Sequence, residues 1–381
     1  MAEINRIEQT YRRLTASGKN VLRLFSGNPT EHGFRFPPEI LKKSYDRFFQ
    51  SQEYHPHPKG LPEARRAIQN YYATQNTLLD LEHIILTSGT SESFFYLFSL
   101  LAKLGDNILI PNPSYPLFDD IAKLAGVTLR PYSLREDQNW AVDLEDLHNK
   151  TDSRTRAIVL VSPNNPTGSV ISAEQIQEIV AWANQKDISL ICDEVFSEFY
   201  FGKNVFPRAL SVSKPKLCFI LNGISKMFAL PALKLSWIGV GGEKNRVEIV
   251  VDQLETLADT FLSTHTPIQE ALPALFTEGW SFVQDYRREV QERRDLAVSL
   301  LKACPPIHFN PPVGSYYLMG EITKKIPSSE EEFVIRLMEE KNVFIHPGYF
   351  YDYEKGIHFV ISFLTKKEKL KDGLEALISI L

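Results

Sequence analysis

Two residues of this sequence, a lysine and a carboxylate that follow short apolar runs, are the best suited to chemistry. Lys226 follows the run Leu217–Leu221, and Asp193 directly follows Ser189–Cys192. A lysine desolvated among apolar neighbours can lose its proton and become a nucleophile that forms an imine. A buried carboxylate is costly unless it meets a cation, which a protonated ring nitrogen or a structural salt bridge would supply. Each residue alone could also be structural.

Three further turns carry groups that suit a planar, phosphorylated ligand. Gly89, Thr90 and Ser91 stand between an apolar run and a helical stretch, where free backbone N–H groups favour a phosphate. Tyr115, in the proline-rich loop PNPSYP, could lie flat against a planar ligand, and Asn165, in SPNNPTG, could donate to a ring oxygen. An ordinary helix cap, a packing tyrosine and a plain turn are the alternatives for these three sites.

Short apolar runs predict the strands that must position these residues. They are rich in β-branched residues and bounded by turn residues: His83–Thr87, Asn107–Ile110, Ala157–Val161, Ser189–Cys192 and Leu217–Leu221. Ser172 and Gln175 form a capping box that predicts a helix between two of them. Alternating strands and helices predict a mostly parallel sheet covered by helices on both faces, with ligands beyond the carboxyl ends of the strands.

The two ends of the chain differ from this middle part. Residues 1–44 are rich in turns. After residue 265 come a long charged helix and two hairpin-like runs, at Trp280–Lys302, Gly314–Leu318 and His358–Phe363. We therefore expect a large α/β domain over residues 45–265 and a smaller α+β domain built from residues 1–44 plus 266–381.

The composition excludes several classes of protein. The 381 residues include 42 Lys plus Arg and 47 Asp plus Glu, a net charge of −5 without a basic run, which argues against nucleic-acid and membrane-surface partners. Three scattered cysteines, no apolar signal core and no apolar run of about 18 residues predict a cytoplasmic protein without a membrane span. His55 and His57 lack a suitably spaced third ligand, so no metal site is expected.

In their order and location these motifs resemble those of the class I/II aminotransferase family, which are fold-type I pyridoxal-phosphate (PLP) enzymes. The resemblance runs from SGNP at 26–29 to Pro347-Gly348 and is most specific at NNPTG (164–168), DEVF (193–196) and SKMFALPALKLSW (225–237). It implies an α/β fold, with a mostly parallel sheet of the seven-stranded type flanked by helices in a large PLP-binding domain, and a smaller α+β domain.

The resemblance also implies roles for single residues. Lys226 would form the Schiff base with PLP and move the Cα proton, while Asp193 would pair with the protonated pyridine nitrogen. Tyr115 would stack on the ring, and Asn165 would bind its phenolic oxygen. The phosphate would be held by Gly89, Thr90, Ser91, Ser225 and Lys234, the last of which stands where the family has an arginine.

Tyr54 matches a tyrosine that reaches the phosphate of the neighbouring subunit, so the resemblance implies a homodimer with shared active sites. Two departures from the family pattern lie near the cofactor. Phe196 stands where a tyrosine usually binds the phenolic oxygen, so one donor is lost unless Tyr200 substitutes for it. Gly223 replaces a frequent phosphate-binding serine, so Ser225 and Lys234 would carry more of the phosphate's charge.

A third departure concerns the substrate. Val360 stands where the family has an arginine that grips the substrate α-carboxylate. Either another cation replaces it, with Arg23, Arg35 and His358 as candidates, or the amino donor is not a standard α-amino acid. Expected substrate contacts are Gly27, Asn165 and His358.

The leading functional hypothesis is a PLP-dependent aminotransferase. It would move an amino group from an amino acid or related amine to a 2-oxo acid by a ping-pong route through Lys226. A C–S/β-lyase or a decarboxylase would share the fold and the lysine, so the motifs do not separate them. A non-catalytic PLP-binding regulator is a remote alternative that a fused DNA-binding module would mark, and none is expected in this chain.

Overall fold

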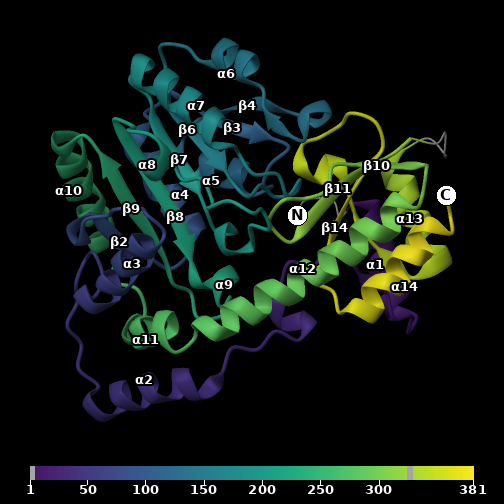
Figure 1. Ribbon diagram of the computed structural model, residues 1–381, viewed down its shortest axis with the longest axis horizontal. Coiled ribbons are helices and arrows are strands. Elements are labelled where there is room, and N and C mark those ends of the chain that lie inside the picture. The colour runs from purple at the N-terminus through teal and green to yellow at the C-terminus, as the bar shows by residue number, and fades with distance from the viewer. Residues whose placement is uncertain (1–4, 324–328) are drawn as a thin grey trace.

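The computed structural model describes residues 5–323 and 329–381, and an eight-stranded sheet forms its centre (Figure 1). The strands, in spatial order, are β2 (Ile84–Thr87), β9 (Ser236–Gly242), β8 (Leu217–Gly223), β7 (Ser189–Asp193), β6 (Thr155–Val161), β3 (Asn107–Asn112), β4 (Thr128–Arg135) and β5 (Ala141–Val142). Strands β9 and β5 run in the direction opposite to that of the other six strands of this sheet. The predicted mostly parallel sheet is confirmed, and the short edge strand β5 makes it eight-stranded rather than seven-stranded.

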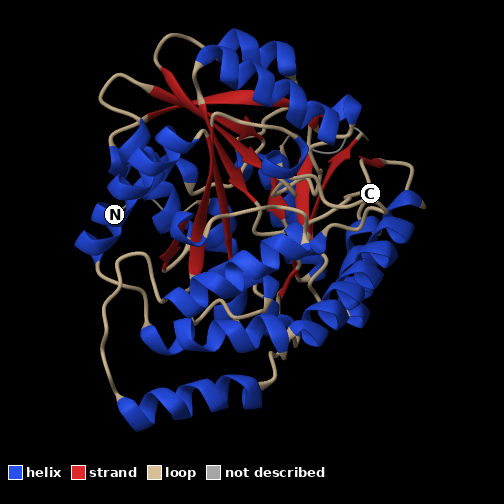
Figure 2. Cartoon of the chain, turned by 60° about the vertical axis from the view of Figure 1, so that its left-hand side comes forward, coloured by secondary structure: helices blue, strands red, loops and turns tan. Residues whose placement is uncertain are grey.

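Helices cover both faces of this sheet, because side chains of each strand alternate between two apolar cores. Along β6, Ala157 and Val159 belong to one core and Ile158 and Leu160 to the other. The first core includes α4 (Thr90–Leu101), α5 (Phe118–Ala125) and α10 (Lys244–Phe261). The second includes α3 (Pro62–Thr74), α6 (Leu144–Lys150), α7 (Ala173–Lys186), α8 (Ala209–Val212) and α11 (Thr266–Thr277). Figure 2 shows the strands enclosed by helices.

The predicted helix after Ser172 is α7, with its apolar face buried. Ser172 Oγ accepts a hydrogen bond from the Gln175 N–H at 3.2 Å, as a capping box requires. The Gln175 side chain instead donates to the Val142 carbonyl at 3.0 Å and so ties α7 to β5. The capping box is therefore half formed.

A smaller antiparallel sheet contains the strands β10 (Ile307–Phe309), β11 (Tyr317–Ile322), β14 (His358–Ser362) and β13 (His346–Pro347), in that order. Helix α12 (Trp280–Lys302), predicted with these bounds, runs from the large sheet toward it (Figure 1). The same part of the molecule contains α1 (Arg6–Ala16), α13 (Glu330–Lys341), α14 (Lys367–Ile378) and the parallel pair β1 (Leu22–Arg23) and β12 (Val343–Phe344). The two hairpin-like runs pair with each other as β11 and β14, although α13 separates them in the chain.

The remaining helices connect these parts. They are α2 (Pro38–Ser51), α9 (Ile224–Met227) and the 3₁₀ turns η1 (Pro29–His32), η2 (Leu81–His83), η3 (Glu136–Gln138), η4 (Ser197–Phe199) and η5 (Gly348–Tyr351). Of the two expected domain boundaries, residue 266 is the first of α11, whereas residues 44 and 45 lie inside α2, which packs on α11. The division into domains stays a prediction. No helix in the described ranges is long and apolar enough to cross a membrane.

Candidate active site

A cavity of about 450 Å³ opens at the carboxyl ends of the parallel strands, where a ligand is expected in such a sheet. All the predicted cofactor residues except Tyr54 line it: Gly89, Thr90, Ser91, Tyr115, Asn165, Asp193, Ser225, Lys226 and Lys234. The turns after β2, β3, β6, β7 and β8 supply these residues, so the parallel arrangement brings together segments that are far apart in the chain.

Lys226 lies on the short helix α9 at the end of β8, and its ammonium Nζ donates to the Gly27 carbonyl at 3.1 Å. Burial, with the nearby charge of Lys234, lowers the pKa of Lys226 to about 8, although Asp193 opposes this. A substantial fraction of this amine is neutral near pH 8, which suits a nucleophile or a proton carrier.

Asp193 ends β7 and is 7% exposed. Burial raises the pKa of Asp193 to about 6, while the Val195 N–H and Lys226 act in the opposite direction. Among the described residues Asp193 has no ion-pair partner within 4.0 Å, whereas the adjacent Glu194 is paired with buried Arg208 at 2.8 Å. The structural salt bridge therefore belongs to Glu194, and Asp193 remains available to a cation in the cavity.

The start of α4 forms the end of the cavity that suits a phosphate. Gly89 is the N-cap, and no side chain caps the helix there. A Cβ built on Gly89 would meet no atom within 4 Å, so the space before the free N–H groups is open. The hydroxyl-bearing Thr90 and Ser91 follow at the first two helical positions.

Ser236 lines the cavity and was missed in the sequence. It lies opposite Gly223 in the antiparallel pair of β8 and β9. A Cβ added to Gly223 would lie 2.2 Å from Ser236 Oγ, so this hydroxyl occupies the space of a side chain at position 223. Strand β9 thus supplies a hydroxyl group where the family pattern appeared to lack one.

Tyr317 on β11 is a second lining residue that the sequence did not reveal. Its hydroxyl oxygen packs against Gly27, because a Cβ there would lie 1.9 Å from it. Its ring lies edge-on to Phe196 with 6.0 Å between centroids. Tyr200, the candidate substitute for the missing hydroxyl, does not line the cavity, and its ring packs on Gly202. Tyr317 therefore places a phenol of the cavity beside Phe196. The ring of Tyr316 is nearer to Phe196, at 4.9 Å between centroids, but its hydroxyl donates to the Lys226 carbonyl at 3.1 Å.

Glu92 places an unexpected carboxylate beside the predicted phosphate end. It accepts hydrogen bonds from the Ser88 N–H and hydroxyl group and from the Tyr96 hydroxyl at 2.5 Å. These donors hold the carboxylate against the start of its own helix. The sequence signal was an acidic residue in the first helical turn, which is also an ordinary helix-stabilising feature.

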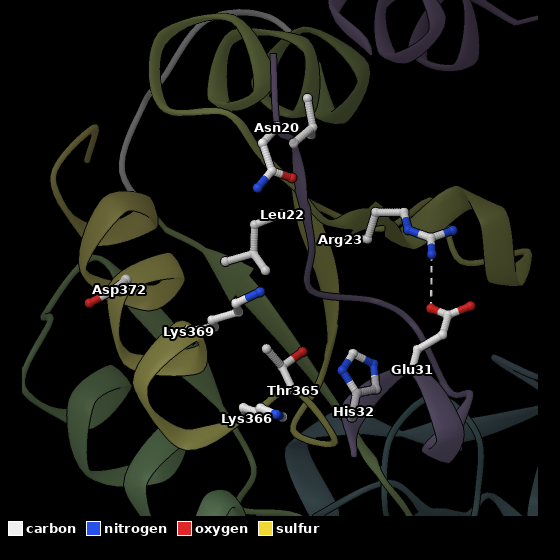
Figure 3. Close-up of a pocket in the computed structure, with 10 residues that line it drawn as sticks. Asn20, Leu22, Arg23, Glu31, His32, Thr365, Lys366, Lys369 and Asp372 are labelled. Atoms are coloured by element: carbon white, nitrogen blue, oxygen red, sulfur yellow. Dashed lines mark hydrogen bonds and ion pairs between the residues drawn. The ribbon is translucent and has the colours of Figure 1, made fainter. Parts of the chain in front are cut away.

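None of the three expected replacements for the missing arginine lines the cavity. Arg23 is paired with Glu31 at 2.8 Å in a different pocket (Figure 3), and Arg35 donates to the backbone carbonyls of Thr30 and Phe34. His358, an expected substrate contact, is buried with Nε2 at 3.1 Å from the Glu136 carboxylate. Among the residues that the structure describes, the cations that line the cavity are the two lysines at positions 226 and 234.

Val360 is fully buried on β14, between Met319 of β11 and His346 of β13 in the register of the small sheet. Burial lowers the pKa of His346 to about 4, so its imidazole is neutral at pH 7. Neither Met319 nor His346, the two neighbours of Val360 in the sheet, therefore provides a fixed cation for a substrate carboxylate.

One group of three potential metal ligands occurs in residues 5–323 and 329–381, namely Glu136, Glu321 and His358, with ligand atoms within 4.8 Å of one another. The Glu136 carboxylate is already bound by His358 Nε2 and by the Tyr353 hydroxyl at 3.1 Å. These partners satisfy it without an ion, and the group lies outside the cavity that holds Lys226.

Comparisons with known proteins agree with this site. The family model described as aminotransferase class I and II matches residues 19–377. The glutamate-pyruvate aminotransferase AlaA of Haemophilus influenzae is 29% identical over 371 residues, covering 96% of this chain and 91% of that protein. The alanine aminotransferase of Mycobacterium tuberculosis is 27% identical over 378 residues, covering 97% and 88%.

A solved structure of an alanine aminotransferase from Pyrococcus furiosus has a TM-score of 0.92 to this chain at 27% identity, covering 98% of this chain and 95% of that one. The relatives and the solved structure thus match nearly the whole length of this chain, and the family model covers most of it. The chain therefore belongs to the class I and II aminotransferase family.

Proposed function

We propose that this aminotransferase uses PLP to move an amino group between an amino acid or related amine and a 2-oxo acid by a ping-pong route. The observation that carries the proposal is that Lys226 and Asp193 line the same cavity, beside the uncapped N-terminus of α4. Lys226 has a lowered pKa, and Asp193 has no ion-pair partner among the described residues. The aminotransferase names of the relatives support transamination over the lyase, decarboxylase and regulator alternatives.

The residues of the cavity fit PLP group by group. Asp193 would hold the protonated pyridine nitrogen, and Tyr115 would pack against the ring. Asn165 lines the same cavity, and its side-chain N–H₂ group would donate to the phenolic oxygen. The phosphate would lie at the start of α4, with hydroxyl groups and a positive charge from Thr90, Ser91, Ser225, Ser236 and Lys234.

PLP, when bound, supplies an electron sink that stabilises the negative charge left on the substrate Cα when its proton is removed. Lys226 is the residue that would hold the cofactor and carry that proton, since burial leaves its amine partly neutral near pH 8. Asp193 would keep the ring nitrogen protonated, and Tyr317 would supply the phenolic donor that Phe196 lacks. The buried walls would exclude water from the reacting atoms.

We further propose a cytoplasmic homodimer with shared active sites. Tyr54 is 62% exposed and lies outside its own chain's cavity, as a residue that reaches a partner's phosphate must. Phe261 and Leu262, also exposed, precede Ser263, whose hydroxyl donates to the His57 carbonyl at 3.1 Å. The segment of Tyr54 therefore adjoins an exposed apolar surface suited to a second copy. Three buried free cysteines fit a reducing compartment.

The test is a half-reaction. The purified protein is incubated with a panel of amino acids and amines, and the visible spectrum of its cofactor is followed together with 2-oxo acid and ammonia release. Conversion of the cofactor to its amine form with stoichiometric keto product is expected. Release of ammonia or carbon dioxide without that form would contradict transamination, and Lys226→Ala serves as the variant that cannot hold the cofactor covalently.

A further inference from the structure

A second cavity, of about 580 Å³, lies in the part of the chain that contains the small sheet, and it shares no lining residue with the catalytic cavity. It runs along the first two turns of α14 and is closed on the other side by residues 20–23 and 31–32 (Figure 3). Nothing in the proposed transamination uses these residues.

The beginning of α14 faces this cavity without a cap. Helix α14 has 12 residues, and the side chain of its N-cap residue, Lys366, makes no capping hydrogen bond. The first N–H groups of a helix need acceptors and carry a partial positive charge. Thr365, immediately before the cap, and Lys369, one turn later, also line the cavity.

Thr365 carries the observation that indicates a ligand. The residue is only 1% exposed, and its hydroxyl Oγ1 is buried with no hydrogen-bond partner among residues 5–323 and 329–381. Buried hydroxyl groups are nearly always paired, so an orphaned one needs an explanation. Figure 3 shows the Thr365 oxygen pointing into the space enclosed by the lining residues, on the side of His32.

The charges at the cavity favour an anion. Lys366 and Lys369 both line it, and neither has an ion-pair partner in the described part of the chain. Arg23 adds a guanidinium, although Glu31 neutralises it at 2.8 Å. The one further carboxylate, Asp372, points away from the other lining residues (Figure 3).

We propose that this cavity binds a small organic oxyanion, with its phosphate or carboxylate group at the N-terminus of α14. Lys366 and Lys369 would supply charge, Thr365 would donate its hydroxyl proton, and the body of the ligand would lie against Leu22. The volume is in the range of small-molecule sites, about 300–1,000 Å³, and exceeds what a bare phosphate ion needs.

The test measures binding to enzyme whose cofactor has been fixed by borohydride reduction, so that the catalytic phosphate position is already filled. Radiolabelled inorganic phosphate and radiolabelled pyruvate are each measured by equilibrium dialysis at constant ionic strength set with chloride. We expect one saturable site per chain for at least one probe. Phosphate binding alone would identify a phosphorylated ligand, and pyruvate binding alone a carboxylate.

The variants locate the site. Lys366→Ala with Lys369→Ala should weaken binding at least about tenfold, because two charge-assisted contacts are lost. Lys371→Ala, on the same helix but outside the cavity and paired with Glu375, is the matched control and should bind like the wild type. Equal binding in all three proteins, or no saturable binding of either probe to the wild type, would overturn the proposal.

Thr365→Val gives a second readout that does not depend on charge. The valine keeps the shape but removes the donor, so anion binding should weaken about fivefold. Without anion the variant should unfold at the same or a higher urea concentration, because the hydroxyl has no partner to lose. A clear destabilisation in anion-free buffer would show that the hydroxyl serves the fold rather than a ligand.

Discussion

Ser236 and Gly223 face each other across β9 and β8, and the hydroxyl oxygen of Ser236 fills the space that a side chain at position 223 would need. The end of the cavity where we propose the cofactor phosphate therefore has a hydroxyl group that comes from the neighbouring strand. Gly223 therefore does not leave this part of the cavity without a hydroxyl group, because Ser236 on the paired strand provides one.

The first prediction concerns this hydroxyl. Ser236→Ala should weaken PLP binding about tenfold, the loss expected for one hydrogen bond to a charged group. Ser236→Gly combined with Gly223→Ser should recover part of the affinity, because the glycine removes both Ser236 atoms that a Cβ at position 223 would meet, Oγ at 2.2 Å and Cβ at 2.9 Å. Fluorescence titration of cofactor-free protein gives the dissociation constants. Unchanged affinity in Ser236→Ala would remove Ser236 from the phosphate site.

The second prediction follows from the pKa of Lys226. Since only the neutral amine attacks a carbonyl group, the rate of covalent PLP incorporation at saturating PLP should rise about tenfold from pH 7 to pH 9 and then level off, as expected for a pKa of about 8. Lys234→Met removes the charge that helps to lower this pKa and should shift the profile to higher pH. Stopped-flow absorbance measures the rates, and a pH-independent rate would contradict the assignment.

The third prediction concerns Asp193 in the cofactor-free protein. Burial raises its pKa to about 6 from the ordinary 3.8, so the folded chain holds this proton more tightly than the unfolded chain does. Its contribution to stability is therefore complete below about pH 4 and is lost as the pH rises through 6. The difference between the two pKa values, 6 − 3.8, corresponds to about 3 kcal/mol in the free energy of unfolding.

Asp193→Asn removes this titration. The free energy of unfolding of the wild type minus that of Asp193→Asn should therefore fall by about 2 kcal/mol between pH 4 and pH 7, as measured in urea, because part of the change occurs below pH 4. Asp120→Asn, at an exposed carboxylate on α5, is the control. A difference that stays constant with pH would show that Asp193 is not desolvated in the folded chain.

The fourth prediction tests the phenolic donor. Tyr317→Phe should lower the rate of the half-reaction about tenfold, because the hydroxyl group at Gly27 is lost. Phe196→Tyr should restore much of the rate in that variant, since the two rings adjoin with 6.0 Å between centroids. Stopped-flow measurements of the cofactor spectrum decide it. A wild-type rate in Tyr317→Phe would leave the hydroxyl without a catalytic role.

The fifth prediction concerns Val360. Val360→Arg should raise kcat/KM for ordinary α-amino acids at least about tenfold, because a guanidinium can bind a carboxylate bidentately. Val360→Met, which adds length without charge, is the matched control and should not do so. Strong wild-type activity on α-amino acids with no gain in Val360→Arg would show that another cation already binds the carboxylate.

Local patterns in the sequence determined the parallel core and most of the cavity. Strand ends such as Asp193 and helix starts such as Thr90 could be located because apolar runs mark buried strands and ligands gather at their carboxyl ends. The bounds of α12 and the cap at Ser172 were also predictable, since helix periodicity and capping are local properties.

Contacts between distant segments were decided only by the tertiary structure. Ser236 and Tyr317 enter the site through strand register and through the approach of the small sheet, and neither can be read from one segment alone. The same holds for His358, whose Nε2 is bound by Glu136 of η3 rather than turned to a substrate. Strand pairing and packing between segments far apart in the sequence fix such positions. The sequence therefore determined which reactive groups are present, and the fold determined which of them line one cavity.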